Sequence, residues 1–531
     1  MTEQITARPD TYFLQEAIDR GIDAIDARLD RKEGMRPFFE LWVAPTPRMA
    51  HAIWDFGDMS ARYTDALILG RQVTGNEKYP EDDAALRSVL GKCNPWDNPF
   101  MPGRMAVSFL DQYLQEPSEE RLHTLDNLVS VARAGLTFED DYAYYFRHPK
   151  GWNTWDDAVF GNFEPYPTYP LGGLILALTR YGEAGGSAES EDLLERIARF
   201  VLRESGTFCE DGKYKGHTHS GGILTAATGL FRWAVRVGNT AVAEQMRNAF
   251  DWTVENSSSW GWVPDGLGRD NTTSETCSIT DAVHLGLLIA RHVDPSYYGI
   301  VERYVRNQFL ENQITKTHLL LPRERTPEID VIETALRGSW MASARPNSLD
   351  DLLNTQVEGC CLGSGVRGLY LAWEDTVTRR GDKVSVNMSF SRNSEWVEVI
   401  GYQPYEGRVD VIVHDAPKVE IRIPEWVSVK DLKVNLNGRT IPAMVSASRY
   451  VQLEDLRPGD RASVEYPLRH EEKTEMANNL EFQVKWRGDT VVGIEPRGEV
   501  YPLFERDHFQ GEPPMLTEQP YKNQTGGPVH W

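Results

Sequence analysis

The sequence predicts a multidomain α+β protein in which an (α/α)6 helical toroid is followed by an antiparallel β-sandwich. Up to residue 375, apolar side chains recur every three or four positions, which is the spacing of one helical face. After Thr376 they alternate with polar side chains, as in a half-buried strand. Short turns such as 237–239 and 294–296 join the helical segments in pairs. These observations together predict the fold class.

The helical half contains twelve segments with one apolar face. In the first, apolar residues from Leu14 to Leu29 lie at three- and four-residue intervals. Twelve helices joined as hairpins make six units, which would close into an α/α toroid. The expected helices span residues 14–29, 48–74, 81–90, 104–116, 118–136, 168–182, 188–205, 219–237, 239–256, 275–293, 295–312 and 362–375.

The second half is predicted as strands, for which a sandwich is the economical packing. Turn signals at Asn437-Gly438 and Pro458-Gly459 separate strands. The expected strands span residues 383–390, 396–400, 408–413, 419–423, 433–436, 450–453 and 462–466. We expect a catalytic toroid at 1–375, a β-sandwich at 376–503 and a polar extension at 504–531 that lies over the surface or is partly disordered.

The chain carries a large negative charge. Its 531 residues include 56 Lys and Arg against 79 Asp and Glu, which gives a net charge of −23 at pH 7. Such a surface repels phosphate backbones and anionic headgroups, so neither nucleic acid nor a membrane is an expected partner. No stretch reaches the roughly 20 apolar residues of a membrane helix, and residues 1–10 lack a secretory pattern. We therefore expect a soluble, cytoplasmic protein; the sequence leaves a homodimer open.

The cysteines are expected to be reduced. An odd number of cysteines in a long chain argues against a disulfide framework. Two adjacent cysteines can hardly bridge each other without backbone strain. The five are Cys93, Cys209, Cys277, Cys360 and Cys361.

Two short motifs at expected helix starts suggest a metal site. Glu275-Thr276-Cys277 begins one helix and Cys360-Cys361 begins the last. Three thiolates and one carboxylate are a ligand set that suits zinc, and helix N-termini favour the thiolate form. Because Glu275 and Cys277 are two positions apart, the first turn must be irregular for both to reach one ion. Buried cysteines that pack as small hydrophobic residues are the alternative.

These motifs resemble glycoside hydrolase family 127, the β-L-arabinofuranosidases and their relatives. Glu275-Thr276-Cys277 is similar to the family's Glu-Thr-Cys, and Cys360-Cys361 to its Cys-Cys about eighty residues later. The helical hairpin between His219 and Thr253 and the sandwich segments 421–426, 434–438 and 459–461 follow the family's order. The resemblance covers residues 210–500.

The resemblance implies a retaining glycosidase that acts on a terminal sugar through a zinc-bound thiolate. Glu275, Cys277 and Cys361 would be zinc ligands, and Cys360 would be both ligand and nucleophile. A thiolate is intrinsically nucleophilic, and coordination keeps it ionised near neutral pH. The expected cofactor is therefore zinc, and the expected partner is a small oligosaccharide or glycoside.

The sequence departs from the family at the general acid/base. Relatives carry a glutamate about sixteen residues before the Glu-Thr-Cys glutamate, where this chain has Ser259. Asp265 follows a Trp-Gly-Trp-Val-Pro loop and is our candidate for the acid/base. A turn residue in Pro264-Asp265-Gly266 is the alternative interpretation.

Sugar contacts are expected from loops that combine tryptophan with carboxylates, because rings stack on indole and hydroxyls bond to carboxylates. The candidates are Asp58, Trp155 and Trp262. The family resemblance implies a hydroxyl contact for His219. Core packing explains such aromatic residues equally well.

Two other functions stay open at this stage. Asp265 with Asp58 or Asp157 could form the carboxylate pair of an inverting hydrolase, or serve a lyase for uronic sugars. In a non-catalytic alternative, zinc is structural and the chain is a carbohydrate-binding protein.

Overall fold

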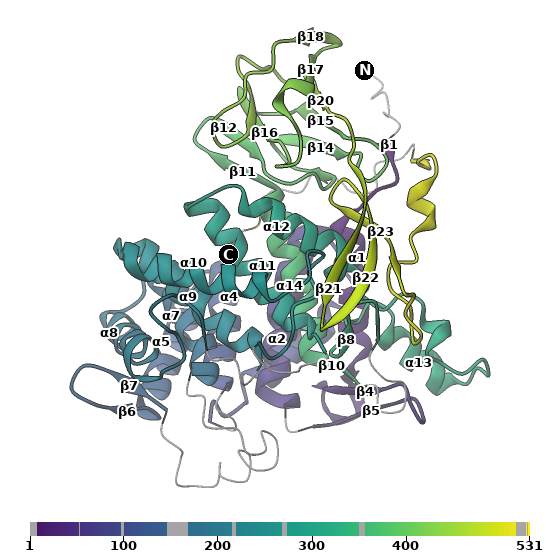
Figure 1. Ribbon diagram of the computed structural model, residues 1–531. Helices are drawn as coiled ribbons and strands as arrows, with labels where there is room; N and C mark the ends of the chain where they lie inside the picture. Colours follow the sequence, from purple (N-terminus) through teal and green to yellow (C-terminus); the bar gives the residue numbers. More distant parts are fainter. Residues whose placement is uncertain are drawn as a thin grey trace.

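The computed structural model describes residues 8–52, 54–96, 100–145, 168–214, 219–267, 273–349, 356–516, 527 and 529–531. Within these ranges, six parallel helices form a closed inner ring (Figure 1). Each packs against the next, and α14 closes the ring on α2. The inner helices are α2 (Ser60–Thr74), α4 (Met101–Gln115), α7 (Thr168–Glu183), α9 (Ser220–Val237), α11 (Thr276–His292) and α14 (Gly359–Thr376).

A second helix covers each inner helix from outside, so the predicted (α/α)6 toroid is confirmed. The inner helices are buried on all sides; in α11, every residue from Thr276 to Ala290 is buried. Outer helices are amphipathic and expose one charged face. They are α1 (Leu14–Ala27), α3 (Pro80–Leu90), α5 (Glu119–Ala134), α8 (Ala188–Arg199), α10 (Thr240–Glu255) and α12 (Tyr297–Tyr304).

The structure corrects the helix predictions in two places. Residues 48–50, expected to begin a helix, form β5 (Arg48–Ala50), and α2 starts only after a wide turn at Asp55–Met59. A further helix, α13 (Pro327–Leu336), was not predicted. It begins at a Thr326 N-cap and buries only Ile332, Ala335 and Leu336, so its short apolar face gives a weak periodic signal.

The β-sandwich consists of a four-stranded and a six-stranded sheet around a core rich in valine. Its strands pair antiparallel as predicted, except that β12 and β16 run parallel. The first sheet contains β11 (Val377–Arg380), β12 (Lys383–Val386), β16 (Lys418–Arg422) and β19 (Tyr450–Leu453). The second contains β13 (Arg392–Asn393), β14 (Val397–Gly401), β15 (Arg408–Val413), β20 (Arg461–Glu465), β17 (Lys433–Leu436) and β18 (Arg439–Ile441).

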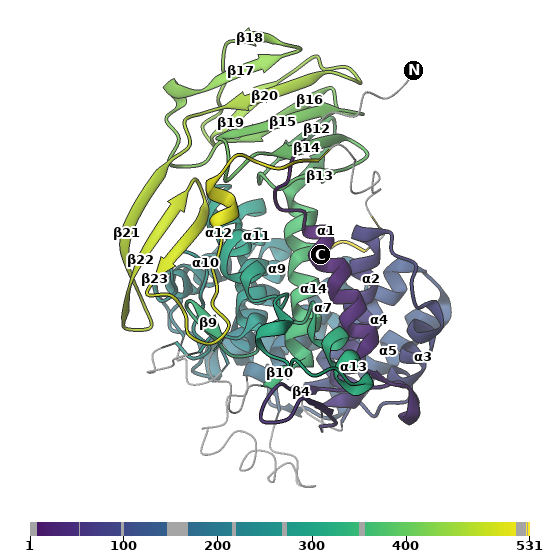
Figure 2. The ribbon, with the colours of Figure 1, turned by 90° about the vertical axis from the view of Figure 1, so that its right-hand side faces the viewer.

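A third sheet follows the sandwich but joins neither of its layers. It lies along the side of the toroid (Figure 2), where its own Phe482 and Trp486 share a hydrophobic core with Trp260. Its strands are β21 (His470–Ala477), β22 (Leu480–Arg487) and β23 (Thr490–Glu495). The shorter strands are β1 (Arg8–Pro9), β2 (Leu29–Asp30), β3 (Arg36–Pro37), β4 (Glu40–Trp42), β6 (Thr137–Phe138), β7 (Ala143–Tyr144), β8 (Ala344–Arg345), β9 (Ser348–Leu349), β10 (Gln356–Glu358) and β24 (Met515–Leu516).

The two ends of the helical ring have different surroundings. All six inner helices begin at one end, which we call the amino end, and finish at the carboxyl end, which faces the sandwich (Figure 1). Residues 529–531 pack into the carboxyl end. Val529 and Trp531 are buried there, which corrects the expectation that this segment lies over the surface. None of the described helices combines the length and hydropathy needed to cross a membrane.

Candidate metal centre and active site

The predicted site residues meet at the amino end of the ring. Glu275 is the extended N-cap of α11, so it stands outside the helix while Cys277 lies in the first turn. This geometry provides the irregular start that the two-residue spacing requires. On α14, Gly359 precedes the cysteine pair, and a Cβ at that position would lie 2.7 Å from the Tyr63 hydroxyl. The glycine therefore lets the start of α14 approach α2 closely.

Three sulfur atoms and one carboxylate oxygen converge in a buried cluster. The Cys361 Sγ lies 3.9 Å from the sulfur atoms of both Cys277 and Cys360. The thiols of Cys360 and Cys361 each lie 3.4 Å from Glu275 Oε1. One ligand atom from each of the four residues falls within 4.8 Å of the others. The cluster could therefore hold a metal ion, as the sequence predicted.

The other carboxylate oxygen of Glu275, Oε2, pairs with His219 Nε2. His219 is the N-cap residue of α9, and its Nδ1 lies 3.7 Å from Asp265 Oδ1. Asp265 also accepts a hydrogen bond of 3.3 Å from Ser278. The structure thus brings together His219, Asp265 and Glu275, whose ligand atoms also lie within 4.8 Å of one another.

A buried arginine connects this cluster with α2. Arg62 donates through Nε to Asp58 at 3.0 Å and through Nη1 to Ser364 at 3.0 Å. The same Nη1 lies 4.0 Å from Cys277 Sγ. Asp58, a predicted sugar contact, is thus buried in an ion pair with Arg62, and Arg104 lies 3.7 Å from it.

Burial and crowding shift the ionisation of these groups. Hydrogen bonds from Cys360 and Cys361, with the Arg62 charge, hold the pKa of Cys277 well below its usual value. The hydrogen bond to Cys277 raises the pKa of Cys360. Burial raises the pKa of Glu275 to about 8. The negative charges of Glu275 and Asp265 outweigh burial and raise the pKa of His219 to about 10. Clustering of shifted groups is typical of functional sites.

One carboxylate in the cluster was not predicted. Glu358 is the N-cap residue of α14, and its Oε2 lies 3.3 Å from Cys360 Sγ. Burial raises the pKa of its carboxyl group to about 7. Its position at a helix start, two residues before Cys360, is the sequence feature that could have predicted a place for Glu358 in the cluster.

Trp262 and Ser259 make structural contacts instead. Trp262 is only 2% exposed, and its indole nitrogen donates to the Ala344 carbonyl at 2.8 Å. A ring this buried supports the backbone and has no face for a sugar. Ser259, at the family's acid/base position, instead donates to Glu475 on β21. Trp155 and Asp157 lie outside the described residues.

Comparisons with known proteins find similarity in structure but not in sequence. No family model and no curated protein matches the chain. A GH127 β-L-arabinofuranosidase from Geobacillus stearothermophilus T6 superposes with a TM-score of 0.59 at 13% identity, covering 91% of this chain and 80% of that one. A second GH127 β-arabinofuranosidase gives 0.60 at 14%, covering 90% and 80%. A protein described as a glycoside hydrolase gives 0.62 at 12%, covering 92% and 84%.

The chain therefore has the fold of the GH127 arabinofuranosidases, the family that its motifs resemble. At this identity the likeness concerns the fold, and a fold hosts many chemistries. The function has to be argued from the residues at the amino end.

Proposed function

We propose that the chain is a retaining glycosidase that removes a terminal, arabinofuranoside-like sugar with a zinc-bound cysteine thiolate as nucleophile. The observation that carries this proposal is the convergence of three thiols and one carboxylate from two distant stretches of chain. The structural neighbours described as GH127 arabinofuranosidases support the choice of sugar class.

The donor set fits zinc in chemistry and spacing. A tetrahedral ion with bonds of about 2.3 Å to sulfur separates two sulfur atoms by about 3.8 Å, and two of the sulfur pairs here lie 3.9 Å apart. A sulfur and an oxygen would be separated by about 3.6 Å, and Glu275 Oε1 lies 3.4 Å from the sulfur atoms of both Cys360 and Cys361. Glu275, Cys277, Cys360 and Cys361 would hold the ion, which when bound keeps the thiols deprotonated near neutral pH.

Cys360 is the best placed of the three cysteines to attack a sugar. Its side chain is the most exposed, at 8% against 3% for Cys277 and none for Cys361. In the proposed first step, Cys360 Sγ forms a bond to the anomeric carbon while the bond from that carbon to the leaving oxygen breaks. Asp265 gives its proton to that oxygen. In the second step, Asp265 takes a proton from water, the water oxygen bonds to the anomeric carbon, and the carbon–sulfur bond breaks.

His219 has a positioning role in this proposal. Its contact with Glu275 fixes which carboxylate oxygen faces the sulfur atoms, as partners of ligating carboxylates commonly do. Its ring lies between Glu275 and Asp265 and so also places the proposed acid.

The pairing of Asp265 with Asp58 is less well supported. Asp58 forms ion pairs with Arg62 and Arg104, so it is poorly placed to act as the second carboxylate with Asp265. Four protein ligands also suit a structural zinc site in a carbohydrate-binding protein. The greater exposure of Cys360 favours catalysis over that alternative.

The proposal is tested by a screen of nitrophenyl furanosides and pyranosides with and without a chelator. We expect hydrolysis of at least one furanoside, loss of activity with chelator, and a product of retained anomeric configuration. Hydrolysis with inversion, or full activity of metal-free protein, would exclude the thiolate mechanism.

The assignment of Asp265 needs its own comparison, because Glu358 also lies beside Cys360. Removing a general acid costs about 10²- to 10⁴-fold in rate and costs less for a leaving group that needs no proton. We expect Asp265→Asn to slow an alkyl glycoside more than a nitrophenyl glycoside. The same leaving-group dependence in Glu358→Gln and not in Asp265→Asn would move the role to Glu358.

A further inference from the structure

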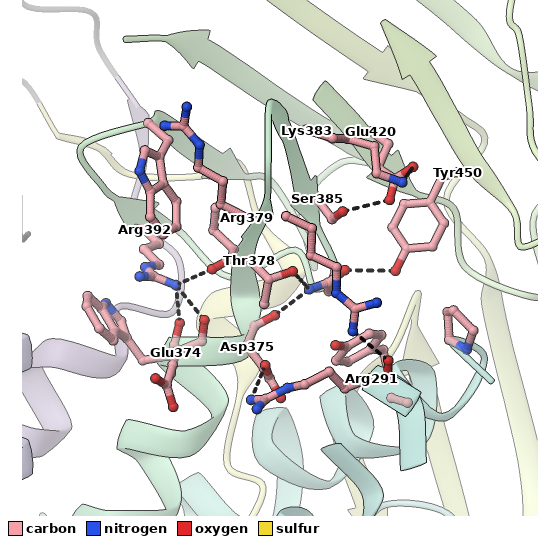
Figure 3. Close-up of a pocket in the computed structure, with 18 of the residues that line it drawn as sticks. Arg291, Glu374, Asp375, Thr378, Arg379, Lys383, Ser385, Arg392, Glu420 and Tyr450 are labelled. Atoms are coloured by element: carbon pink, nitrogen blue, oxygen red, sulfur yellow. Dashed lines mark hydrogen bonds and ion pairs between the residues drawn. The ribbon is translucent and has the colours of Figure 1, made fainter. Parts of the chain in front are cut away.

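A cavity of about 560 Å³ lies between the carboxyl end of the helical ring and the β-sandwich, at the end remote from the thiol cluster (Figure 3). Its walls come from α11, α14, the first sheet of the sandwich and the segment around His530. Its volume falls within the roughly 300–1,000 Å³ of small-molecule sites.

The cavity carries more positive than negative side chains, although the chain as a whole has a net charge of −23. Its carboxylates are Glu374, Asp375 and Glu420. Its cationic side chains are Arg291, Arg379, Arg380, Lys383 and Arg392. An excess of cationic groups in an acidic protein favours an anionic occupant.

Arg392 is a buried cation whose hydrogen bonds go to backbone carbonyls. It is 5% exposed, and its Nη1 donates to the backbone carbonyls of Trp373, Glu374 and Val377. Among the described residues, no carboxylate forms an ion pair with it. Burial accordingly lowers the pKa of Arg392 to about 10.

The two nearest carboxylates are occupied by other partners. Glu374 accepts hydrogen bonds from His530 at 2.7 Å and from the Trp531 backbone at 3.3 Å. Asp375 forms an ion pair of 2.7 Å with Arg291. Glu374 and Asp375 attract the Arg392 guanidinium, but neither forms an ion pair with it. The Arg392 charge therefore also acts on whatever fills the cavity.

Four further residues of the cavity would meet such a ligand. Arg380 is exposed, and its guanidinium donates to the Arg291 carbonyl at 3.0 Å but pairs with no carboxylate of the described part of the chain. Trp396 is half-buried and lines the cavity, with the Arg379 guanidinium 5.9 Å from its ring centre. Ser446 and Ser448 line the same cavity. A ring suits the indole, and its hydroxyl groups suit the serines.

We propose that this cavity binds a small acidic sugar, whose carboxylate or phosphate lies against Arg380 in the field of Arg392. The site lies at the opposite end of the ring from the cysteines, so it is independent of the proposed catalytic reaction.

The test is titration calorimetry of the full chain with glucuronate, glucose 6-phosphate, inorganic phosphate and neutral glucose. We expect at least one sugar acid or sugar phosphate to bind at millimolar concentration or below, more tightly at low salt, and glucose to bind at least about tenfold more weakly because it cannot make a charge-assisted hydrogen bond. Preference for glucuronate would identify a carboxylate ligand, and preference for glucose 6-phosphate would identify a phosphate ligand; both support the proposal. Inorganic phosphate bound as tightly as glucose 6-phosphate would show an anion site that does not recognise a sugar, and would overturn it.

Two variants probe the cavity without touching its buried network. Arg380→Gln should weaken binding about tenfold, and Ser448→Asp should abolish it by placing a negative charge in the cavity. Arg439→Gln removes an equally exposed arginine from β18, outside the cavity, and should bind as the unmodified protein does. Absence of binding by every anionic probe, equal binding of glucose, or unchanged binding by Arg380→Gln and Ser448→Asp would overturn the proposal.

Discussion

The two ends of the helical ring differ in how their buried charged groups are paired. At the carboxyl end most charges have an opposite partner: Arg180 pairs with Asp111 at 2.7 Å, and Arg291 pairs with Asp375. At the amino end, three thiols and the Glu275 and Glu358 carboxyl groups crowd together. Acidic groups gathered in a buried site stay protonated unless a cation joins them.

The backbone reinforces this contrast. Six helix N-termini point at the amino end, where their unpaired N–H groups and dipoles favour negative charge. At the carboxyl end, helical side chains instead bind the backbone of residues 529–531. Gln72 and Tyr370 both donate to the Val529 carbonyl, at 3.2 and 2.6 Å. The difference fits the chemistry proposed for the amino end, and it suits most of the carboxyl end to a stabilising role.

The largest expected effect is on turnover, from Cys360→Ser at the amino end. A serine hydroxyl is far less ionised than a thiol, so we expect activity to fall by about 10³-fold or more while the chain remains folded. Because Cys360 is also a proposed zinc ligand, bound zinc and the melting temperature should fall as well. The measurement is steady-state hydrolysis of the best nitrophenyl glycoside. Cys209→Ser changes an exposed cysteine in the same way and should leave activity intact. Normal turnover by Cys360→Ser would remove the distinction between the two ends.

The next effect is loss of metal. Cys277→Ala removes one of four ligands, so we expect bound zinc to fall from about one ion per chain to a small fraction, and the free energy of unfolding to fall with it. Elemental analysis after dialysis measures the first quantity. Cys93→Ala, outside the cluster, is the matched control. Full metal content in Cys277→Ala would place the ion elsewhere.

At the carboxyl end we expect an effect on stability alone. Trp531 is 1% exposed, and the Arg180 guanidinium lies 3.9 Å from its ring centre. Trp531→Ala should lower the free energy of unfolding by about 3–5 kcal/mol, measured by denaturant titration, and leave kcat of the folded protein unchanged. Met515→Ala, at an exposed side chain, should cost little. A catalytic defect in folded Trp531→Ala would show that the two ends are coupled.

The smallest effect sharpens the comparison within the amino end. Arg62→Lys keeps the positive charge but loses the planar guanidinium, whose Nε and Nη1 donate to Asp58 and Ser364 at the same time. We expect activity to fall by about tenfold with metal content unchanged. Arg121→Lys, on the exposed start of α5, is the control for the substitution. A loss of metal in Arg62→Lys would assign Arg62 to the support of the ligands instead.

The fold was largely predictable because the spacing of apolar residues along each segment already distinguishes helix from strand. Inner helices such as α9 and α11 show helical spacing together with caps and turn residues, and the change of period at Thr376 marks the strands. The segment 529–531 was not predictable, because three residues carry no periodic signal. Trp531 is buried only because helices far away in sequence provide Arg180 and Arg367 around its ring.

The candidate site was predictable where its residue types are rare. Cysteines next to a glutamate at helix starts suggest a metal, and the structure brings all four together. Residue types that are common in proteins were harder to assign. Trp262 was predicted to stack on a sugar but is buried, and Glu358 resembles any carboxylate at a helix start. Arg62 reaches Cys277 across 215 positions of sequence, which no local pattern encodes.

The central claim is that one ion is held by three sulfur atoms and one carboxylate oxygen at the amino end of the ring. X-ray absorption at the zinc edge on the purified protein tests it most directly. The account predicts about three sulfur neighbours at about 2.3 Å and one oxygen at about 2.0–2.2 Å. A shell of nitrogen and oxygen atoms alone, or protein that binds no zinc, would contradict it.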